Sequence, residues 1–320
     1  MAIVFQTDFA WSSDDIERGV IERAGHTLIT GPSTPLPAVE IEEMVASVNP
    51  EAIMTCWADV SAKAIVRPDR LRIVQRIGVG LDNIAVDAAT SRGAWVANVP
   101  DYCVGEVADH AIGFLLSWAR GVTSFDREVK LGQWDPTAAK LRRVSDLTIG
   151  FIGWGRIARA TASRLKAFGP RMLVYTPFGE GGGDAAITGL EQLLAESDAV
   201  IIHAPLTPES HHMFDDKRIS QMKSGAFLIN VSRGPLVDNA ALLAALENSH
   251  LSGAGLDVVE GEPAPPLELI RRPDVIATPH VAFSSGASLA ELRRRSAEEV
   301  VRVLAGERPL YPCNDPEGRS

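Results

Sequence analysis

Short apolar runs that fit buried strands alternate with amphipathic segments that fit helices along most of the chain. The run 148–152 is the clearest strand, because it is short, apolar and closed by a glycine turn. The clearest helix is 104–119, whose apolar residues recur at steps of three and four and would form one face. This alternation predicts a parallel α/β architecture. The other expected strands are 3–7, 27–30, 52–55, 72–77, 94–98, 171–175, 199–203, 226–231, 253–257 and 275–278, and the other expected helices are 14–24, 37–48, 156–168, 190–196, 215–222, 240–247 and 288–305.

The stretch 120–145 interrupts this alternation. It reads as loop-rich and holds two aromatic residues, Phe125 and Trp134, that we expect to be exposed. A loop of this length inside a compact domain usually has a function. An arm that contacts a second copy of the chain in a homodimer is one candidate for this function.

The composition is that of an ordinary globular protein and bears on location. Of 320 residues, 46% are hydrophobic and 22% are charged, and this length is comfortable for two domains. No apolar run approaches the ~20 residues of a membrane-spanning helix. Residues 1–8 lack the pattern of a signal peptide, so we predict a cytoplasmic protein without membrane partners. Three widely spaced cysteines, Cys56, Cys103 and Cys313, fit neither a disulfide framework nor a zinc site.

The net charge of −10 argues against nucleic acid as a partner, because duplex-binding domains normally carry a basic face. The one basic cluster, 293–295, falls in a segment of helical pattern that also carries acidic residues. We interpret this cluster as a solvated helix face. An anionic small molecule would need only local positive charge, which the net value does not address.

A glycine-rich turn follows the strand 148–152. Gly153, Gly155 and Ala158 fit the pattern G-x-G-x-x-A between a strand and a helix. The first glycine permits a tight turn, the second lets the backbone approach a pyrophosphate, and the third small residue lets the helix pack on the strand. The free N–H groups at the start of the helix would then bind the anion. The context of strand, turn and helix indicates a dinucleotide site.

The residue that usually separates NAD from NADP is absent here. In NAD sites an acidic residue about twenty positions after the turn binds the ribose hydroxyls. Thr176 lies 21 residues after Gly155 at the end of the next expected strand, and a threonine cannot repel a 2′-phosphate. No arginine follows it in 177–181. The sequence therefore leaves NAD(H) and NADP(H) both open.

Three later segments place polar residues where expected strands end, namely 230–234, 257–263 and 278–280. Ligands of open α/β sheets bind beyond the carboxyl ends of the strands. We therefore expect these segments and the turn at Gly153 to line one site.

With these residues in place, the chain resembles the D-isomer-specific 2-hydroxyacid dehydrogenase family, which includes phosphoglycerate dehydrogenases and hydroxypyruvate reductases. Within it, 101–103 and 280–283 resemble the branch related to C-terminal-binding proteins. The resemblance covers most of the chain. It is carried by 76–84, 106–110, the glycine turn, 203–207, 230–234 with Val237 and Asp238, 256–258 with Glu262 and Pro263, and 278–280.

The resemblance implies a catalytic triad of Arg233, Glu262 and His280. Reduction of a ketone places negative charge on its oxygen, so a proton must arrive with the hydride, and an imidazole suits this task near neutral pH. A neighbouring carboxylate favours the imidazolium and orients it. An arginine grips a carboxylate at two points.

The resemblance also implies binding residues for substrate and cofactor. The substrate would contact the turn at Val79 and Gly80 together with Arg233 and His280, and Asp257 would face the nicotinamide amide. The implied cofactor-binding residues are Val104, Gly153, Gly155, Arg156, Ile157, Thr176, His203, Pro205, Thr207, Val231, Ser232, Arg233, Asp257 and His280.

Other candidates compete for these roles. Glu260 is an alternative partner for His280, although the spacing from Asp257 and the proline after Glu262 favour Glu262. The pair 211–212 consists of two histidines without a carboxylate or cysteine at metal-ligand spacing, so we expect it to face solvent and expect no metal site. His110, on an amphipathic helix, is expected to be packed or to cap rather than to react.

The resemblance implies an α/β protein with a Rossmann nucleotide-binding domain at 99–284 and a flavodoxin-like, discontinuous substrate domain at 1–98 and 285–320. The chain would cross between them near 99 and 285, and closure at this hinge would expel water before hydride transfer. The function that follows is an NAD(P)-dependent D-2-hydroxyacid dehydrogenase or 2-oxoacid reductase. The alternative is a nucleotide-sensing binding protein of the corepressor branch with little turnover.

Overall fold

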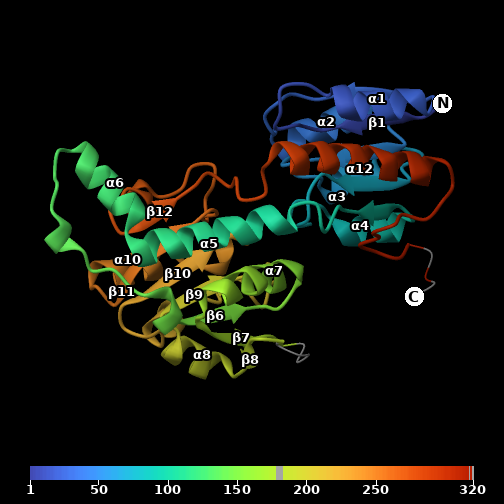
Figure 1. Cartoon of the computed structure of the whole chain (residues 1–320). Helices are drawn as coiled ribbons and strands as arrows, with labels where there is room; N and C mark the ends of the chain where they lie inside the picture. Colours follow the sequence, from blue (N-terminus) through green and yellow to red (C-terminus); the bar gives the residue numbers. More distant parts are fainter. Residues whose placement is uncertain (178–182, 317, 319–320) are drawn as a thin grey trace. The chain divides into compact units, whose positions relative to one another are not determined.

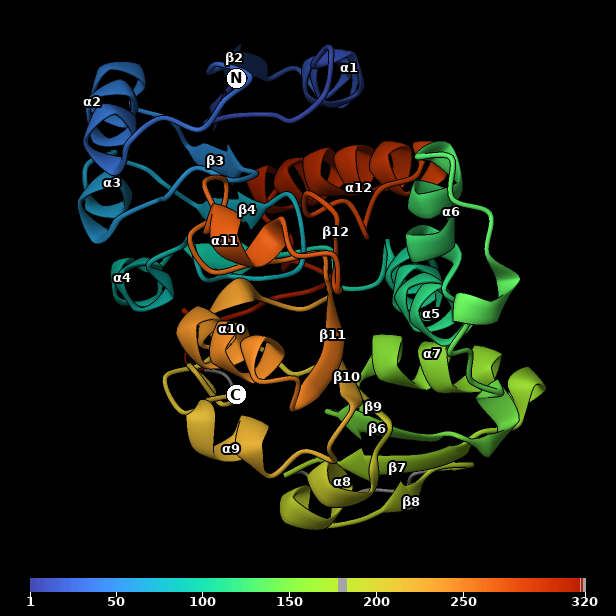
Figure 2. The same cartoon turned by 90° about the vertical axis from the view of Figure 1, so that its left-hand side faces the viewer.

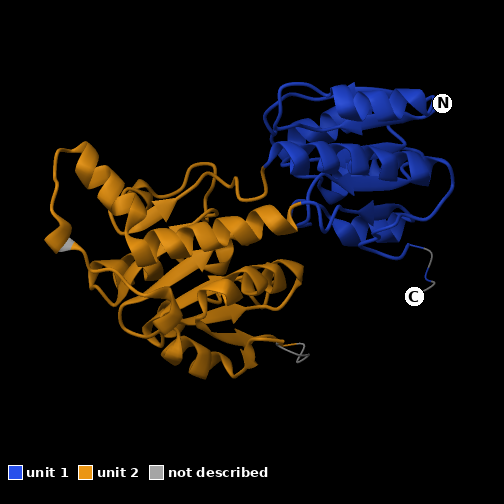
Figure 3. Cartoon of the chain, viewed as in Figure 1, with its two compact units in different colours: residues 1–102, 285–320 blue, residues 103–284 orange. Residues whose placement is uncertain are grey.

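The computed structural model describes residues 1–177, 183–316 and 318, and it divides the chain into two compact units (Figure 3). Unit 1 comprises Met1–Tyr102 and Ser285–Ser320, and unit 2 is Cys103–Ser284. Each unit has its own parallel sheet and its own buried core. The predicted parallel α/β architecture is therefore confirmed.

Unit 1 is built on a five-stranded sheet in the order β2-β1-β3-β4-β5. Helices α2, α3 and α4 cover one face, and α1 and α12 lie side by side on the other (Figure 2). The strands are β1 (Ile3–Gln6), β2 (Thr27–Thr30), β3 (Ala52–Thr55), β4 (Ile73–Arg76) and β5 (Trp95–Ala97). The helices are α1 (Asp15–Arg23), α2 (Ala38–Val48), α3 (Ala62–Val66), α4 (Val86–Arg92) and α12 (Gly286–Leu304).

The basic cluster 293–295 is not a solvated face, contrary to the expectation. Arg293 is 8% exposed, and its guanidinium donates to the fully buried Glu17 of α1 at 2.7 Å. Arg295 pairs with Asp101 at 2.7 Å, and only Arg294 is largely exposed. The reason is that α12 packs along α1, so one side of its basic cluster lies inside unit 1.

Unit 2 contains a seven-stranded parallel sheet in the order β12-β11-β10-β9-β6-β7-β8. Helices α8, α9 and α10 share one apolar core on one face, and α5 and α7 lie on the other (Figures 1 and 2). The strands are β6 (Thr148–Ile152), β7 (Arg171–Tyr175), β8 (Ala186–Ile187), β9 (Ala199–Ile202), β10 (Ala226–Asn230), β11 (Leu251–Leu256) and β12 (Val275–Ala277). The α-helices are α5 (Val104–Arg120), α6 (Val122–Lys130), α7 (Arg156–Leu165), α8 (Leu190–Glu196), α9 (Asp216–Ser220), α10 (Asn239–Glu247) and α11 (Leu267–Ile270).

The stretch 120–145 is not simply loop-rich, because α6 occupies its first part. Gly121 adopts a positive φ of 62° and separates α5 from α6. Phe125 is half-buried against Gly121, whereas Trp134 is 84% exposed, so the expectation of two exposed aromatics was right only for Trp134. The short helices α3, α4 and α11 and the two-residue strand β8 were also missed. Among the described residues, no helix combines the length and apolar character needed to cross a bilayer.

The order of strands in unit 2 places the functional edge of the sheet. From β6 the chain proceeds to β7 and β8 on one side and then returns to β9 on the other side of β6. Ligands of open parallel sheets bind beyond the carboxyl ends of the strands at such a switch point. The turn after β6 and the residues after β9, β10, β11 and β12 therefore define the edge to examine.

Candidate active site

The turn after β6 has the features of a phosphate-binding turn. Gly153 adopts a φ of +92°, and a Cβ there would lie 2.6 Å from the carbonyl oxygen of His203. A Cβ at Gly155 would meet nothing within 4 Å, and Ala158 in the first turn of α7 is fully buried. No side chain of the described residues caps α7. Arg156 and Ile157 thus present helix-start N–H groups beside open space, which suits an anion.

His203 directly follows the neighbouring strand β9, and its ring packs against other side chains. Its ring stacks on Phe151 with centroids 6.2 Å apart, and Nε2 lies 3.2 Å from the Thr161 hydroxyl. Burial lowers the pKa of His203 to about 3, because a desolvated imidazolium is disfavoured. The ring is therefore neutral near pH 7, and it is suited to packing rather than to proton transfer.

The other predicted cofactor residues after β7 and β9 carry no titratable side chain. Pro205 and Thr207 lie in an exposed turn in which the Ser210 hydroxyl donates to the Pro205 carbonyl at 2.8 Å. Thr176 is half-buried directly after β7. Residues 178–181, which contain no arginine, lie outside the described residues. Val104 is half-buried at the first turn of α5.

The segment after β10 holds Arg233 through a buried asparagine. Asn230 is fully buried, and its side chain donates to the Arg233 carbonyl at 2.8 Å and accepts from the Ser232 N–H at 3.0 Å. The Ser232 hydroxyl donates to the Ile202 carbonyl at 2.7 Å, which ties this segment to the end of β9. Val231 is buried. Arg233 is half-buried, and its Nη1 donates to the Ser232 carbonyl at 2.8 Å.

The three polar strand ends lie side by side because β10, β11 and β12 are neighbours in the sheet. The Asp257 N–H donates to the Asn230 carbonyl at 3.0 Å, and the His280 N–H donates to the Asp257 carbonyl at 2.8 Å. The segment of Arg233 also packs on that of Glu260, since a Cβ at Gly234 would lie 2.3 Å from the carbonyl carbon of Val259. The convergence expected from the sequence is therefore present in the backbone.

The structure pairs His280 with Glu262 and not with Glu260. The His280 Nδ1 atom lies 3.0 Å from Glu262 Oε1. The histidine side chain is 20% exposed and the glutamate side chain 37%. With Nδ1 directed at a carboxylate, Nε2 is the ring nitrogen that can hold a proton for another molecule.

Asp257 supports the turn that carries His280, a role that the sequence reasoning missed. Its carboxylate is 2% exposed and accepts from the N–H groups of Val281 and Ala282 at 2.9 Å and from the Thr278 hydroxyl at 2.6 Å. These bonds hold His280 at a φ of +53°, a conformation that costs a non-glycine residue about 1–3 kcal/mol. His110 Nε2 lies 2.9 Å from the Thr278 hydroxyl, so this histidine is packed behind the site, as expected.

The histidine pair 211–212 does not merely face solvent, contrary to the expectation. His212 Nε2 lies 2.9 Å from Glu260 Oε2, and His211 Nε2 lies 3.8 Å from Glu260 Oε1. His212 and Glu260 are 48 positions apart in the sequence, so local residue spacing gives no sign that they pair. Glu260 and Glu262 thus serve different histidines.

In unit 1, the turn after β4 is held by side chains whose roles the sequence did not indicate. The Arg76 guanidinium donates to the Gly80 carbonyl at 2.9 Å, and the Asn98 amide donates to the Val79 carbonyl at 2.7 Å. Both bonds fix the orientation of the peptide groups at the two predicted substrate residues. The Asn83 amide donates to the Ala58 carbonyl at 2.8 Å and anchors the same turn.

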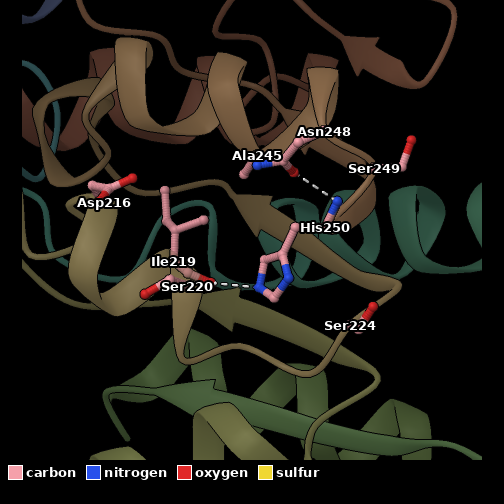
Figure 4. A pocket seen from close by; sticks show the side chains of 8 residues that line it. All are labelled: Asp216, Ile219, Ser220, Ser224, Ala245, Asn248, Ser249 and His250. Carbon is pink, nitrogen blue, oxygen red and sulfur yellow. Dashed lines mark hydrogen bonds between the residues drawn. The ribbon is translucent and has the colours of Figure 1, made fainter.

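A separate pocket in unit 2 lies between α9 and the end of α10 (Figure 4). His250 lines this pocket. Its ring Nε2 lies 3.0 Å from the Ile219 carbonyl oxygen, and its backbone N–H donates to the Asn248 side chain at 2.9 Å. None of the predicted site residues lines this pocket. It brings together no pair suited to proton or hydride transfer.

Comparisons with known proteins point to one family. A family model described as D-isomer specific 2-hydroxyacid dehydrogenase, NAD binding domain, matches residues 112–282. A glyoxylate reductase from Korarchaeum cryptofilum is 37% identical over 269 residues, which are 81% of this chain and 81% of that protein.

Solved structures agree with this match. A D-lactate dehydrogenase from Aquifex aeolicus in complex with NAD and lactic acid superposes with a TM-score of 0.83 at 28% identity, covering 95% of this chain and 96% of that one. An NADPH-dependent glyoxylate/hydroxypyruvate reductase from Sinorhizobium meliloti, in complex with NADP and malonate, gives a TM-score of 0.84 at 29% identity, covering 97% and 96%.

Proposed function

Because the chain belongs to the D-isomer-specific 2-hydroxyacid dehydrogenase family, we propose that it reduces a small 2-oxo acid, with glyoxylate and hydroxypyruvate as the first candidates. It is an NAD(P)-dependent oxidoreductase that acts on the CH–OH group of 2-hydroxy acids. The family resemblance predicted from the sequence is thus confirmed, as is the nicotinamide cofactor. The nucleotide-sensing alternative receives no support from the relatives named above.

The observation that carries the proposal is the pair of His280 and Glu262, 3.0 Å apart, beside the strand end that holds Arg233. The carboxylate accepts a hydrogen bond from Nδ1–H, and Nε2 donates its proton to the carbonyl oxygen of the substrate as the hydride reaches the carbonyl carbon. The Arg233 guanidinium binds the substrate carboxylate and polarises the carbonyl. In the oxidation direction the same imidazole accepts the proton of the hydroxyl group.

The residues around the first turn of α7 fit a dinucleotide. The free space at Gly155 and the uncapped start of the helix suit the pyrophosphate. The neutral ring of His203 and the residues at 231–233 would contact other parts of the cofactor. When bound, the cofactor supplies or accepts the hydride. Since Thr176 carries no charge to repel a 2′-phosphate, we propose that the site accepts NADPH as well as NADH.

The remaining assignments complete the proposal. Unit 1 would act as the substrate domain and contact the substrate carboxylate through the backbone N–H groups at Val79 and Gly80. Unit 2 would act as the nucleotide-binding domain. We also propose a cytoplasmic homodimer with neither nucleic acid nor membrane as partner. Trp134, which is 84% exposed in the arm 120–145, supports the dimer, because tryptophan is enriched in protein–protein interfaces.

The test is oxidation of NADH and of NADPH with a panel of glyoxylate, hydroxypyruvate and phenylpyruvate. We expect turnover with at least one 2-oxo acid and the D configuration in any chiral product. Isotopic transfer from deuterated cofactor to the substrate carbon would establish hydride transfer. Cofactor binding without turnover on every acid of the panel would contradict the proposal.

A further inference from the structure

The side chains of His211, His212 and Glu260 converge at one point of unit 2 that the proposed reaction does not use. One donor atom from each of the three lies within 4.8 Å of the others. The two imidazole rings have centroids 4.0 Å apart and are tilted by 34°, so they do not stack face to face. All three groups keep some contact with solvent, which leaves room for water.

The distances suit a small transition-metal ion. Zinc binds imidazole nitrogen and carboxylate oxygen at ~2.0–2.2 Å, which places neighbouring donors of a tetrahedron about 3.3 Å apart. To one and the same oxygen, Glu260 Oε1, the Nε2 atoms of His212 and His211 lie at 3.0 Å and 3.8 Å, on either side of this value. The donor atoms of all three residues lie within 4.8 Å of one another, so rotations of the side chains would complete the arrangement.

The backbone already holds these ligands in place. The His212 N–H donates to the Pro235 carbonyl at 2.8 Å, and this residue has a φ of +48°. The His211 N–H donates to the Thr207 carbonyl at 3.0 Å. The Asn239 side chain donates to the Glu260 carbonyl at 3.0 Å. Little order has to be created when an ion binds, which favours affinity.

A fourth group lies behind the three. Asp238 Oδ2 is 3.9 Å from His212 Nδ1, while Asp238 Oδ1 caps α10 through the Ala240 N–H at 2.8 Å. A carboxylate behind a ligating imidazole is the usual outer partner of a histidine ligand, since it orients the ring and raises its basicity. A slight rotation of the His212 ring toward Asp238 would direct Nε2 at the ion.

We propose that His211, His212 and Glu260 bind a divalent transition-metal ion, with zinc as the reference case and water in the remaining positions. Imidazole donors favour zinc, copper, nickel and cobalt over magnesium and calcium, which prefer oxygen. The ion is separate from the pair of His280 and Glu262. The ion would link the turn at 211–212 to the segment that carries Glu260 and Glu262. The inference does not depend on the proposed reaction.

The test is a Co²⁺ titration of the full chain after chelator treatment, followed by visible absorption, with Zn²⁺ competition and calorimetry. One equivalent is expected, with d–d bands of a four- or five-coordinate site that Zn²⁺ abolishes. His211→Ala and Glu260→Gln should each weaken binding at least about 100-fold, more than the loss of an outer partner. Zn²⁺ should raise the Tm of the wild-type protein and not that of Glu260→Gln.

Two matched variants serve as controls. His250→Asn removes another histidine of unit 2, and Glu262→Gln changes the carboxylate two residues away, and both should keep the wild-type metal affinity. Circular dichroism verifies that each variant is folded. The proposal is overturned if Co²⁺ gives no coordinated spectrum, which would leave only a histidine–carboxylate ion pair. It is equally overturned if the affinity is unchanged in both ligand variants.

Discussion

Glu260 and Glu262 lie on two sides of one segment after β11, and each holds a histidine at nearly the same distance. Glu260 lies 2.9 Å from His212, and Glu262 lies 3.0 Å from His280. Both histidines adopt a positive φ, 48° and 53°. Distance and backbone conformation therefore do not distinguish the two pairs. They differ in the ring nitrogen that faces the carboxylate, Nε2 in His212 and Nδ1 in His280, and in the groups that surround them.

The surroundings assign different chemistry to the two sides. On the Glu260 side a second histidine and Asp238 bring further donors toward the same point. Converging donors suit a cation. On the Glu262 side one carboxylate faces Nδ1 of a single imidazole, beside the segment of Arg233. A single oriented imidazole suits proton transfer. A His–Glu distance alone is thus a poor guide to function.

Replacing His280 by Ala is expected to give the largest effect of any single change. Loss of a general acid costs about 10²–10⁴ in rate, so we expect kcat for 2-oxo acid reduction to fall about 10³-fold. The Kd of the reduced cofactor, measured by fluorescence titration, should change little. His250→Asn is the matched control for removal of a histidine. Turnover within a few fold of wild type would remove His280 from the mechanism.

Glu262→Gln is expected to have the next largest effect. It changes the carboxylate beside His280 and leaves the carboxylate beside His212 in place. The amide keeps the shape but no longer stabilises the imidazolium, so we expect kcat to fall about 10–100-fold with a smaller change in KM. Metal affinity at the other side should persist. Glu268→Gln, an exposed glutamate of α11, controls for the loss of one charge. An unchanged kcat, with chemistry rate-limiting, would contradict this positioning role.

Gly234→Ala is expected to disturb both sides at once. Its new Cβ would lie 2.3–2.6 Å from backbone atoms of Val259 and Glu260, which cannot move as a side chain tip can. We expect a loss of about 1–3 kcal/mol in stability, as for other overpacked sites, together with weaker metal binding and lower kcat. Gly189→Ala, where the added Cβ meets nothing within 4 Å, is the matched control. Equal Tm values for the two variants would show that the segments are not tightly packed.

The sequence predicted those features of the site that follow from local order along the chain. The strand before Gly153, the helix after Gly155 and the three polar strand ends could all be recognised, since each lies within a few residues of its own strand. The spacing from Asp257 also favoured Glu262 over Glu260, and the structure agrees.

The features that sequence analysis missed depend on partners far apart in the chain. His212 and Glu260 are 48 residues apart, and Glu17 and Arg293 are 276 residues apart. Packing of α12 on α1, and of neighbouring strand ends in unit 2, creates these pairs, and residue spacing carries no sign of them. The sequence likewise suggests only a cofactor contact for Asp257, because its three hydrogen-bond donors in the His280 turn lie 21 to 25 residues away.

His203 of unit 2 gives the smallest predicted effect and sharpens the comparison, because its ring faces Phe151 and Thr161 rather than a carboxylate. Burial lowers the pKa of His203 to about 3, while an unfolded histidine titrates near 6.5. Above pH 6.5 both states are neutral and the residue adds no pH dependence. Below pH 6.5, His203 is protonated in the unfolded state but stays neutral in the folded state, so the free energy of unfolding falls as the pH drops from 6.5 toward 3.

His203→Gln should remove this part of the pH dependence while keeping a polar group near Thr161. We expect the wild type to lose on the order of 1 kcal/mol more than the variant between pH 7 and pH 5, or about 2–4 °C in Tm for a unit of this size. Thermal scans of both proteins at the two pH values measure it. An identical change in Tm between the two pH values for the wild type and His203→Gln would contradict this prediction. It would mean that water reaches the His203 ring beside Gly153.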